Sequence, residues 1–372
     1  MKIGVDAKWF FDGPPSGRVV IRNLVRHLVE LTVDDELYII LDKKDRKELF
    51  PYLRPHVRLI YVWGGNNMLS NTFLLPFSAW SLRLDFLIFQ NFAPMVSNFK
   101  RYTYVHDVLF KTHPQFYSRI ERIYLAPIKF LCRFTHRICT VSETEKKRMI
   151  NAGYGREHNI DVIYHGVDDA FMPLERHDKE ALTALSAKYG LPSRFILYVG
   201  RLNVRKNIGN LLRAVPLLKN YNIPLVIVGG YDWKMESLDN LLSELGIQDR
   251  VIFTGPVYGA DLPRIYALAT VFCFVSYAES FGLPALEGMA SGVPVVVSNY
   301  TCLPEICGEA ALYADPDNPS DIAKNIDRLL NDTVLWQEKR VRGLKHAESF
   351  TWSRSAEHLL QSARKTVSSE SV

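Results

Sequence analysis

The chain has 372 residues, of which 48% are hydrophobic and 23% are charged, and its formal net charge is +5. This length predicts two domains rather than one core, and the composition is that of a folded globular protein. No apolar run reaches the roughly 20 residues that a membrane-spanning helix needs. The strand-like start at Ile3-Gly4-Val5 leaves no room for a signal peptide, and the five cysteines form no C-x-x-C pair. We therefore expect a reduced, cytoplasmic protein.

The charge is distributed unevenly along the chain. Residues 1–167 carry 24 Lys and Arg against 16 Asp and Glu, whereas residues 168–372 carry 21 against 24. A basic first half predicts an anionic partner. No zinc-finger spacing or aromatic RNA-binding signature is present, so we expect no nucleic-acid partner. A membrane surface with anionic lipid fits better, and a solvated basic surface is the alternative.

Short apolar runs alternate with helical patterns along the whole chain, which predicts α/β sheets of parallel strands covered on both faces. The strands predicted in the first half are Met1–Val5, Leu37–Leu41, Val57–Tyr61, Phe86–Gln90, Tyr102–His106, Arg137–Val141 and Asp161–Tyr164. Those predicted in the second half are Phe195–Val199, Leu225–Val228, Val251–Phe253, Val271–Phe274, Val295–Val297 and Ala311–Tyr313. The polar joint at residues 165–169 predicts domains at 1–167 and 168–351, followed by a tail helix and a frayed end at 352–372.

The loop Gly13-Pro14-Pro15-Ser16-Gly17-Arg18 links the first strand to a helix predicted over Val19–Glu30. Ser16 is suited to cap that helix, and Gly17 would let a ligand oxygen approach its N-terminus. The loop is not G-x-G-x-x-G, so a dinucleotide fingerprint is absent. A plain strand-to-helix turn is the alternative.

Two segments of the first half are unusually apolar. They are Phe73–Trp80 and Phe110–Phe134, and in the second the cations Arg119, Arg122, Lys129 and Arg133 interleave with aromatic residues. A basic amphipathic face of this kind could lie on a membrane and admit a lipid-linked acceptor. Helices packed on the sheet with basic outer faces are the alternative.

His106-Asp107 ends the predicted strand Tyr102–Val105. A histidine at the carboxyl end of a central strand faces the ligand crevice of such a sheet, and its pKa lies near neutrality. We expect His106 to donate to a sugar hydroxyl or to steady the reacting centre. An interior histidine held by Asp107 is the alternative.

Arg201 and Lys206 follow the predicted strand Phe195–Val199, and Asn207 is placed to cap a helix from Ile208 to about Leu218. A guanidinium and an ammonium that converge at a strand's carboxyl edge suit a diphosphate. Neighbouring Arg205 weakens this pattern, because one of three basic residues could simply be solvated.

The stretch from Glu279 to Glu287 places two carboxylates eight residues apart around a Phe-Gly turn. Pro284 suits the first position of a helix of about two turns, and Gly292 suits the position just past its end. Gly282 permits close approach of a ligand, and the helix start offers N–H groups to an anion. Carboxylates beside an anion site are good acceptors for sugar hydroxyls.

The D-x-D run at Asp315-Pro316-Asp317 lies in a polar loop whose composition is typical of turns and helix caps. We therefore expect no metal site. A departing diphosphate would then be stabilised by Arg201, Lys206 and helix-end N–H groups.

Several of these stretches together resemble retaining glycosyltransferases of the GT-B fold, in family 4 of that classification. In the second half they are Gly200-Arg201, Lys206-Asn207, the run from Ser276 to Glu287, the run Met289-Ala290-Ser291-Gly292-Val293-Pro294-Val295 and Leu303-Pro304-Glu305. In the first half, His106-Asp107 and Val141-Ser142-Glu143 look like family landmarks. The family's usual first loop carries a second glycine, whereas Pro14-Pro15-Ser16 precede Gly17 here.

The resemblance implies two Rossmann-like domains facing a cleft, with the tail helix crossing back to the first domain. It implies that Glu279 binds hydroxyls of the donor hexose and Glu287 those of the ribose, and that His106 contacts the donor sugar. Arg201 and Lys206 would neutralise the diphosphate, with Gly17 approaching it from the first domain. The donor sugar and phosphate would lie against Ser280, Phe281, Gly282 and Leu283.

The reaction that this resemblance implies is a metal-independent hexosyl transfer that retains anomeric configuration. Its donor is a nucleotide-diphosphate sugar, for which we favour GDP-mannose although UDP- and dTDP-sugars remain open, and no other cofactor is expected. Its acceptor is a saccharide or a lipid-linked sugar of a surface polysaccharide, reached at the inner face of the membrane. The alternatives are a GT-B epimerase or phosphorylase, and a non-catalytic protein that binds a sugar nucleotide or a lipid phosphate.

Overall fold

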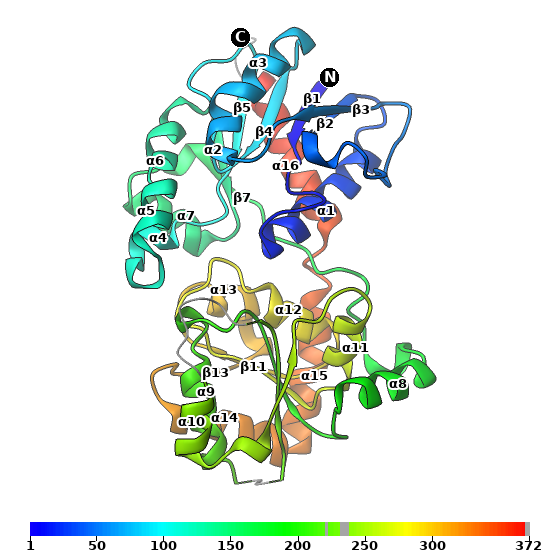
Figure 1. Cartoon of the computed structure of the whole chain (residues 1–372), viewed down its shortest axis with the longest axis vertical. Coiled ribbons are helices and arrows are strands. Elements are labelled where there is room, and N and C mark those ends of the chain that lie inside the picture. Colours follow the sequence, from blue (N-terminus) through cyan, green and yellow to red (C-terminus); the bar gives the residue numbers. More distant parts are fainter. Residues whose placement is uncertain (220–221, 231–237, 369–372) are drawn as a thin grey trace. The chain divides into compact units, whose positions relative to one another are not determined.

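The computed structural model describes residues 1–219, 222–230 and 238–368. The chain forms two compact units (Figure 1). Unit 1 contains residues 1–166 and 351–372, and unit 2 contains residues 167–350. Among the described residues, no helix combines the length and the apolar character needed to cross a membrane.

Each unit is built on one sheet whose paired strands are all parallel in the described part of the chain. The strands of unit 1 are β1 (Lys2–Asp6), β2 (Glu36–Asp42), β3 (Val57–Val62), β4 (Phe86–Gln90), β5 (Lys100–Tyr104), β6 (Arg137–Thr140) and β7 (Ile160–Val162). Those of unit 2 are β8 (Ile196–Val199), β9 (Leu225–Val228), β10 (Val251–Gly255), β11 (Val271–Phe274), β12 (Val295–Ser298) and β13 (Leu312–Ala314). Each strand overlaps one of the predicted apolar runs, which confirms the expectation of two parallel α/β sheets.

The order of the strands is doubly wound in both sheets. It is β3-β2-β1-β4-β5-β6-β7 in unit 1 and β10-β9-β8-β11-β12-β13 in unit 2. The winding reverses between β1 and β4 in the first sheet and between β8 and β11 in the second. In open α/β sheets the ligand crevice lies outside the carboxyl ends of the strands at such a reversal. We call these two places the switch points.

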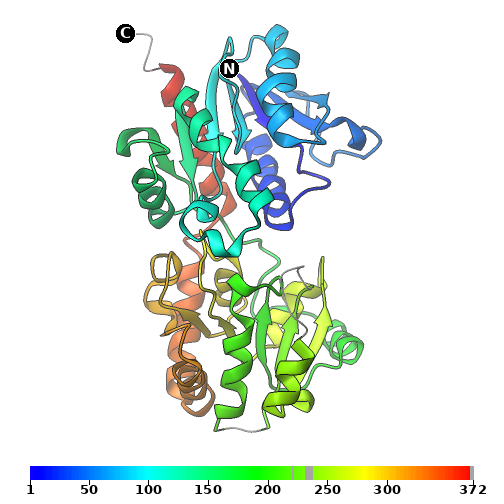
Figure 2. The ribbon, with the colours of Figure 1, turned by 60° about the vertical axis from the view of Figure 1, so that its left-hand side comes forward.

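Helices flank both sheets, as the two views of the chain show (Figures 1 and 2). The α-helices of unit 1 are α1 (Pro15–Leu31), α2 (Asn67–Leu69), α3 (Leu75–Ala79), α4 (Leu109–Thr112), α5 (Arg119–Leu125), α6 (Pro127–Leu131), α7 (Glu143–Asn151) and α16 (Trp352–Ser368). Those of unit 2 are α8 (Lys179–Tyr189), α9 (Ile208–Ala214), α10 (Leu238–Leu245), α11 (Asp261–Leu268), α12 (Leu283–Ala290), α13 (Leu303–Cys307), α14 (Pro319–Asn331) and α15 (Thr333–Ala347).

The predicted tail helix returns to unit 1, where α16 packs against α1, β5 and β6. Its buried face carries apolar side chains such as Leu359 and Leu360, while Arg364 pairs with Asp35. Gly166 lies so close to this helix that an added Cβ would be 2.1 Å from the backbone nitrogen of Trp352. The last helix is therefore an integral part of the first unit.

Candidate functional site

The switch point of unit 2 gathers the charged residues that the sequence singled out there. The strand β8 ends at Val199, and the following loop forms a 3₁₀ turn over Val204–Lys206. Asn203 caps this turn, since its side chain accepts a hydrogen bond from the backbone N–H of Lys206 at 3.1 Å. Arg201 lies at the start of the loop and is exposed, whereas the Lys206 side chain is only 11% exposed.

Asn207 occupies the N-cap position of α9, as predicted, but its side chain does not cap the helix. Asn207 adopts a left-handed backbone conformation with φ of 56°, and its side chain makes no cap contact with α9. Its Nδ2 instead donates to the carbonyl oxygens of Val275 and Pro316, at 2.9 and 2.7 Å. The helix predicted to about Leu218 is present as α9, which ends at Ala214, and as a 3₁₀ turn over Val215–Leu217 that follows it directly. Asn207 thus ties the loop after β8 to the loop after β11.

Lys206 and Glu279 form an ion pair across the switch point, with 2.7 Å between Nζ and Oε1. Burial alone would raise the pKa of Glu279, but Lys206 and Arg205 outweigh it, so the pKa lies below its ordinary value. Burial lowers the pKa of Lys206 to about 8, although Glu279 acts in the opposite direction. The ammonium also lies 4.6 Å from the centre of the Phe274 ring, a cation–π contact.

Arg205 belongs to this cluster, contrary to the idea that it is simply solvated. Its Nη1 donates to the carbonyl oxygen of Ala278 at 2.5 Å and lies 3.2 Å from Oε1 of Glu279. Its backbone oxygen accepts from the N–H of Tyr277 at 2.9 Å. Arg205 therefore holds the Glu279 loop, and only the tertiary structure reveals this contact.

The second carboxylate, Glu287, lies within α12, whose eight residues match the predicted two turns. Pro284 is the second residue of this helix rather than the first, and Gly292 follows its end with φ of 72°. Burial raises the pKa of Glu287 to about 7, while a hydrogen bond from the Tyr266 hydroxyl, at 2.9 Å, opposes that rise. The sequence analysis did not single out Tyr266.

The turn before α12 brings backbone rather than side chains to the edge of the sheet. Gly282 has φ of 101°, and an added Cβ would lie 2.6 Å from Leu303 Cδ2. Phe281 is buried, with its ring 6.1 Å from that of Phe350. Ser280 and Leu283 are half-buried on either side. Pro284 has no N–H, and the N–H of Ala285 donates to the carbonyl oxygen of Gly282 at 3.0 Å. An anion at this helix start would therefore meet the backbone of Leu283 and of the turn before it.

His106 lies two residues beyond the end of β5, in unit 1, and is half-buried. Its Nε2 is 2.8 Å from Oε1 of Gln90, and its ring packs against those of Trp9 and Tyr104, with centroids 5.8 and 4.8 Å away. Burial lowers the pKa of His106 to about 4. The expected titration near neutrality is therefore wrong, and the partner of the ring is Gln90 rather than Asp107.

The helix after the first strand begins earlier than predicted. α1 starts at Pro15 with Pro14 as its cap, and no side chain caps it, so the expected cap at Ser16 is wrong. Proline is pre-organised for the first helical position, and this moves the start forward. Gly17 lies in the first turn, where an added Cβ would be 2.8 Å from Cε3 of Trp9. Packing of the Trp9 indole is thus one reason for glycine here.

A polar network at the switch point of unit 1 was missed by the sequence analysis. Lys8 Nζ lies 2.6 Å from Oδ1 of Asp6 and 2.5 Å from Oδ1 of Asn71. Asn71 Nδ2 in turn donates to Oδ2 of Asp6 at 2.7 Å and to the carbonyl oxygen of Gln90 at 3.2 Å. All four residues are buried. The signal was present in the sequence, because Asp6 and Lys8 directly follow a strand that the apolar run identifies.

Asp315 and Asp317 make the contacts expected of a turn. Oδ1 of Asp315 accepts from the N–H of Asp317 at 2.9 Å, and Oδ2 of Asp317 accepts from the Tyr300 hydroxyl at 3.0 Å. Within the described ranges, no group of three or more His, Cys, Asp or Glu side chains is arranged to hold a metal ion.

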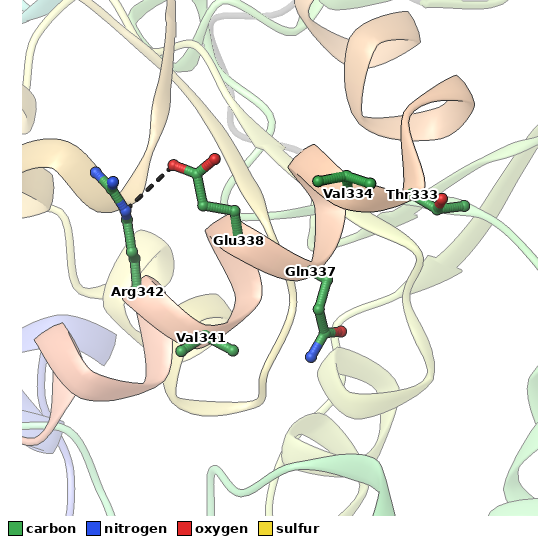
Figure 3. A pocket seen from close by; sticks show the side chains of 6 residues that line it. All are labelled: Thr333, Val334, Gln337, Glu338, Val341 and Arg342. Carbon is green, nitrogen blue, oxygen red and sulfur yellow. Dashed lines mark ion pairs between the residues drawn. The ribbon is translucent and has the colours of Figure 1, made fainter.

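A surface depression with a volume of about 600 Å³ lies along α15 (Figure 3). It is lined by Thr333, Val334, Gln337, Glu338, Val341 and Arg342. Glu338 and Arg342 form an ion pair with 3.2 Å between Oε1 and Nε. Because one helix supplies the whole lining, the depression is an open helix face rather than an enclosed binding site.

Two family profiles match the chain. Residues 17–171 match "Glycosyltransferase Family 4", and residues 184–349 match "Glycosyl transferases group 1". The O-antigen chain mannosyltransferase B of Escherichia coli is 31% identical over 261 residues, which are 67% of this chain and 66% of that protein. A D-inositol 3-phosphate glycosyltransferase of Mycolicibacterium vanbaalenii is 32% identical over 60% of this chain and 52% of that protein. The matched segment thus spans half to two thirds of these relatives.

Solved structures share the fold over almost the whole chain. The Anabaena HepE structure with UDP and glucose has a TM-score of 0.76 at 19% identity, and it covers 98% of this chain and 100% of its own. Sucrose-phosphate synthase of Thermosynechococcus elongatus has a TM-score of 0.75 at 21% identity, with 98% and 95% covered. The two sheets, the returning α16 and the two family matches agree with the predicted resemblance. The chain therefore belongs to the group 1 glycosyl transferases of glycosyltransferase family 4, and it has the GT-B fold.

Proposed function

We propose that this protein transfers a hexose from a nucleotide-diphosphate sugar to a saccharide or lipid-linked acceptor, with retention of anomeric configuration. The observation that carries the proposal is the balance of charge at the switch point of unit 2. Arg205 and Lys206 both contact the carboxylate of Glu279, and Arg201 is near enough to Lys206 to act on its pKa. One carboxylate leaves a surplus of positive charge, and a diphosphate supplies the opposite charge.

In this proposal each residue acts on one part of the donor. Arg201 and Lys206 bind the diphosphate together with the N–H groups before and within the first turn of α12, from Ser280 to Leu283. Glu279 accepts hydrogen bonds from hexose hydroxyls, and Glu287 accepts them from the ribose. In unit 1, His106 contacts the reacting sugar, and the backbone of Gly17 approaches the phosphate.

The proposed reaction breaks the bond between the anomeric carbon and the diphosphate oxygen, and that oxygen keeps the electron pair. The acceptor oxygen forms its bond to the same face of the anomeric carbon, and its proton passes to the departing diphosphate. Arg201 and Lys206 stabilise the charge that develops on the leaving group, as preorganised cations do in other active sites. The proposal assigns no step to a metal ion.

We favour GDP-mannose as the donor, and a growing surface polysaccharide as the acceptor. The support comes from a relative, since the Escherichia coli protein is an O-antigen chain mannosyltransferase. UDP-sugars are the main alternative, because HepE was solved with UDP and glucose.

We also propose that unit 1 contacts the inner face of the membrane. In the helical stretch from Asn67 to Leu82, Phe73, Phe77 and Trp80 are 61%, 86% and 51% exposed. No charged residue occurs between Gly64 and Leu82, and exposed Arg83 follows. Aromatic side chains beside cations favour the interface of an anionic bilayer.

Flotation with vesicles tests the membrane contact. The protein should float with vesicles that contain phosphatidylglycerol and less with pure phosphatidylcholine, and Phe77→Asp should weaken this binding. Tyr258→Asp, at a 68% exposed aromatic residue of unit 2, is the matched control. Equal flotation of the wild type and Phe77→Asp would argue against this contact.

A thermal-shift panel over GDP-, UDP- and dTDP-sugars is the first test of the donor. A ligand that binds the folded protein raises its Tm with the logarithm of ligand concentration. The true donor should therefore give the largest rise in Tm at equal concentrations. Release of nucleoside diphosphate only when an acceptor is added supports transfer over an epimerase or phosphorylase. Binding without turnover over a broad acceptor panel favours a non-catalytic binding protein instead.

Treatment with EDTA tests the metal-free reaction. Turnover should survive prolonged chelation, since protein cations neutralise the leaving group. Loss of turnover that manganese restores would contradict this part of the proposal.

A further inference from the structure

The side chain of Gln90 links the buried network of unit 1 to His106. Gln90 is the last residue of β4, its backbone N–H points to Oδ2 of Asp6 at 3.4 Å, and it is only 2% exposed. Its carbonyl oxygen accepts from Nδ2 of Asn67 and of Asn71, each at 3.2 Å. The position of Gln90 is therefore fixed by three polar side chains that come from β1 and the segment after β3.

Two aromatic rings and a hydrogen bond to the backbone position the ring of His106. Tyr104 and Trp9 pack against it at interplanar angles of 36° and 38°. The backbone N–H of His106 donates to Oδ1 of Asn91 at 3.3 Å. The amide oxygen of Gln90 accepts hydrogen bonds but cannot donate them, so the contact of 2.8 Å requires a proton on Nε2.

We propose that Gln90 is a positioning residue for His106, which holds the ring in the Nε2–H tautomer and leaves the Nδ1 lone pair as an acceptor for a substrate hydroxyl. Nδ1 makes no hydrogen bond with any residue in the described part of the chain. The inference rests on the proposed function, and it changes one part of it. His106 accepts a hydroxyl proton in a hydrogen bond, whereas the sequence analysis expected it to donate.

This arrangement explains why a histidine can serve as a fixed acceptor at neutral pH. A neutral imidazole carries one donor and one acceptor, and the partner of one nitrogen sets the state of the other. Burial keeps the His106 ring uncharged, in agreement with its lowered pKa of about 4. A hydroxyl that donates to Nδ1 must then present its oxygen in a defined direction, which is a positioning effect rather than acid catalysis.

Nitrogen NMR of the protein labelled with ¹⁵N-histidine measures the tautomer directly, and His106→Asn identifies the signal. At pH 7.5 the wild type should show a proton on Nε2 and an unprotonated Nδ1. Gln90→Met keeps the volume but removes the acceptor, and it should give a mixture of both tautomers. Gln90→Glu keeps an acceptor oxygen and should keep the proton on Nε2.

Kinetics with the donor found by the thermal-shift panel give the second readout. Gln90→Met should lower kcat about tenfold, the loss of one oriented hydrogen bond, while the Kd of the donor nucleotide stays within about twofold. Gln90→Glu should recover most of the lost kcat. Gln337→Met on the exposed face of α15 is the matched control and should leave kcat unchanged.

The NMR and kinetic results each test whether Gln90 positions His106. A wild-type signal with the proton on Nδ1 overturns it without reference to activity or to any variant. An unchanged tautomer in Gln90→Met overturns it as well, and so does a changed tautomer with unchanged kcat. If the wild type transfers no sugar at all, the proposed function fails, whereas the NMR result still decides whether Gln90 sets the tautomer.

Discussion

The two switch points have the same topology and each contains an acid and a lysine in contact, yet their charges are balanced differently. In unit 1, Lys8 and Asp6 lie 2.6 Å apart with side chains 2% and 1% exposed, and Asn71 contacts both. In unit 2, Lys206 and Glu279 lie 2.7 Å apart with side chains 11% and 9% exposed. The pair of unit 1 is buried and hydrogen-bonded to Asn71, whereas the pair of unit 2 lies beside two further cations.

The two units share a sheet topology but differ in the charges at their switch points. Sheet topology therefore marks a place where a ligand can bind but does not decide whether one binds. A pair that is buried and hydrogen-bonded to the protein's own side chains is not accessible to a ligand. An acid–lysine pair beside additional cations has a net positive charge, which favours the binding of an anion. We therefore propose that the pair of unit 1 stabilises the fold and that the pair of unit 2 binds the donor.

Breaking the pair of unit 1 should have the largest effect, and it should act on stability. Lys8→Met leaves the carboxylate of Asp6 buried without its cation, so the free energy of unfolding should fall by about 3–5 kcal/mol. Urea unfolding of the full chain measures this. Lys44→Met removes the exposed pair with Asp12 and should change the free energy of unfolding far less, because solvent screens that pair. A similar small loss for both variants would remove the distinction between the two pairs.

Removing the acid of unit 2 should act on turnover instead. Glu279→Ala should lower kcat by about 10³-fold, because the proposed partner of Glu279 is the reacting sugar. The Kd of the nucleoside diphosphate, measured by calorimetry, should change much less. Unchanged turnover, or an equal loss in both quantities, would contradict the assignment of Glu279 to the hexose.

Removing a cation of unit 2 should cost somewhat less. Arg201→Ala and Lys206→Ala should each lose about 2–4 kcal/mol of transition-state stabilisation, seen in kcat/KM. Their free energies of unfolding should fall less than that of Lys8→Met, since Arg205 still contacts Glu279 in the Lys206 variant. Near wild-type values of kcat/KM for both variants would indicate that the diphosphate binds elsewhere.

The smallest effect is a dependence of donor affinity on pH. Lys206, with its pKa near 8, is charged below that pH and becomes neutral above it, so the Kd should rise above pH 8 by up to about tenfold per pH unit. Glu287, with its pKa near 7, is neutral below that pH, so the Kd should also rise toward pH 6 as the ribose loses an ionised acceptor.

Two variants show which residue causes each rise of the donor Kd with pH. Lys206→Arg should remove the alkaline rise, because a guanidinium stays protonated throughout this range. Glu287→Gln should remove the acidic rise. A flat wild-type profile from pH 6 to 9 would show that neither group meets the donor.

The sequence predicted most of the fold, and it singled out the charged residues that lie together at the switch point of unit 2, because both depend on local patterns. Apolar runs such as Phe86–Gln90 and Leu225–Val228 coincide with β4 and β9, and the turn before α12 carries its own glycine and proline. Contacts between distant segments were not predictable. The role of Arg205 depends on the loop around Ala278, and the low pKa of His106 depends on burial by Trp9 and Tyr104.

The errors at the helix starts have a different cause, since the necessary signals were present. Pro15 favours the first position of a helix, which places the start of α1 before Ser16. Asn203 precedes Lys206 by the three residues that a side-chain cap requires, whereas Asn207 takes the N-cap position of α9 without a cap contact.

The return of α16 has a consequence for how the protein is made. The chain leaves unit 1 after Gly166 and re-enters it at Thr351, and the backbones of Val167 and Phe350 are joined by a hydrogen bond of 2.9 Å. Unit 2 is thus an insertion within unit 1. As the chain emerges from the ribosome, unit 2 can fold as soon as residue 350 is free, whereas unit 1 must wait for its last helix. The domain that begins the chain is therefore the last to be completed, and a ribosome that stops early releases a finished unit 2 beside an unfinished unit 1.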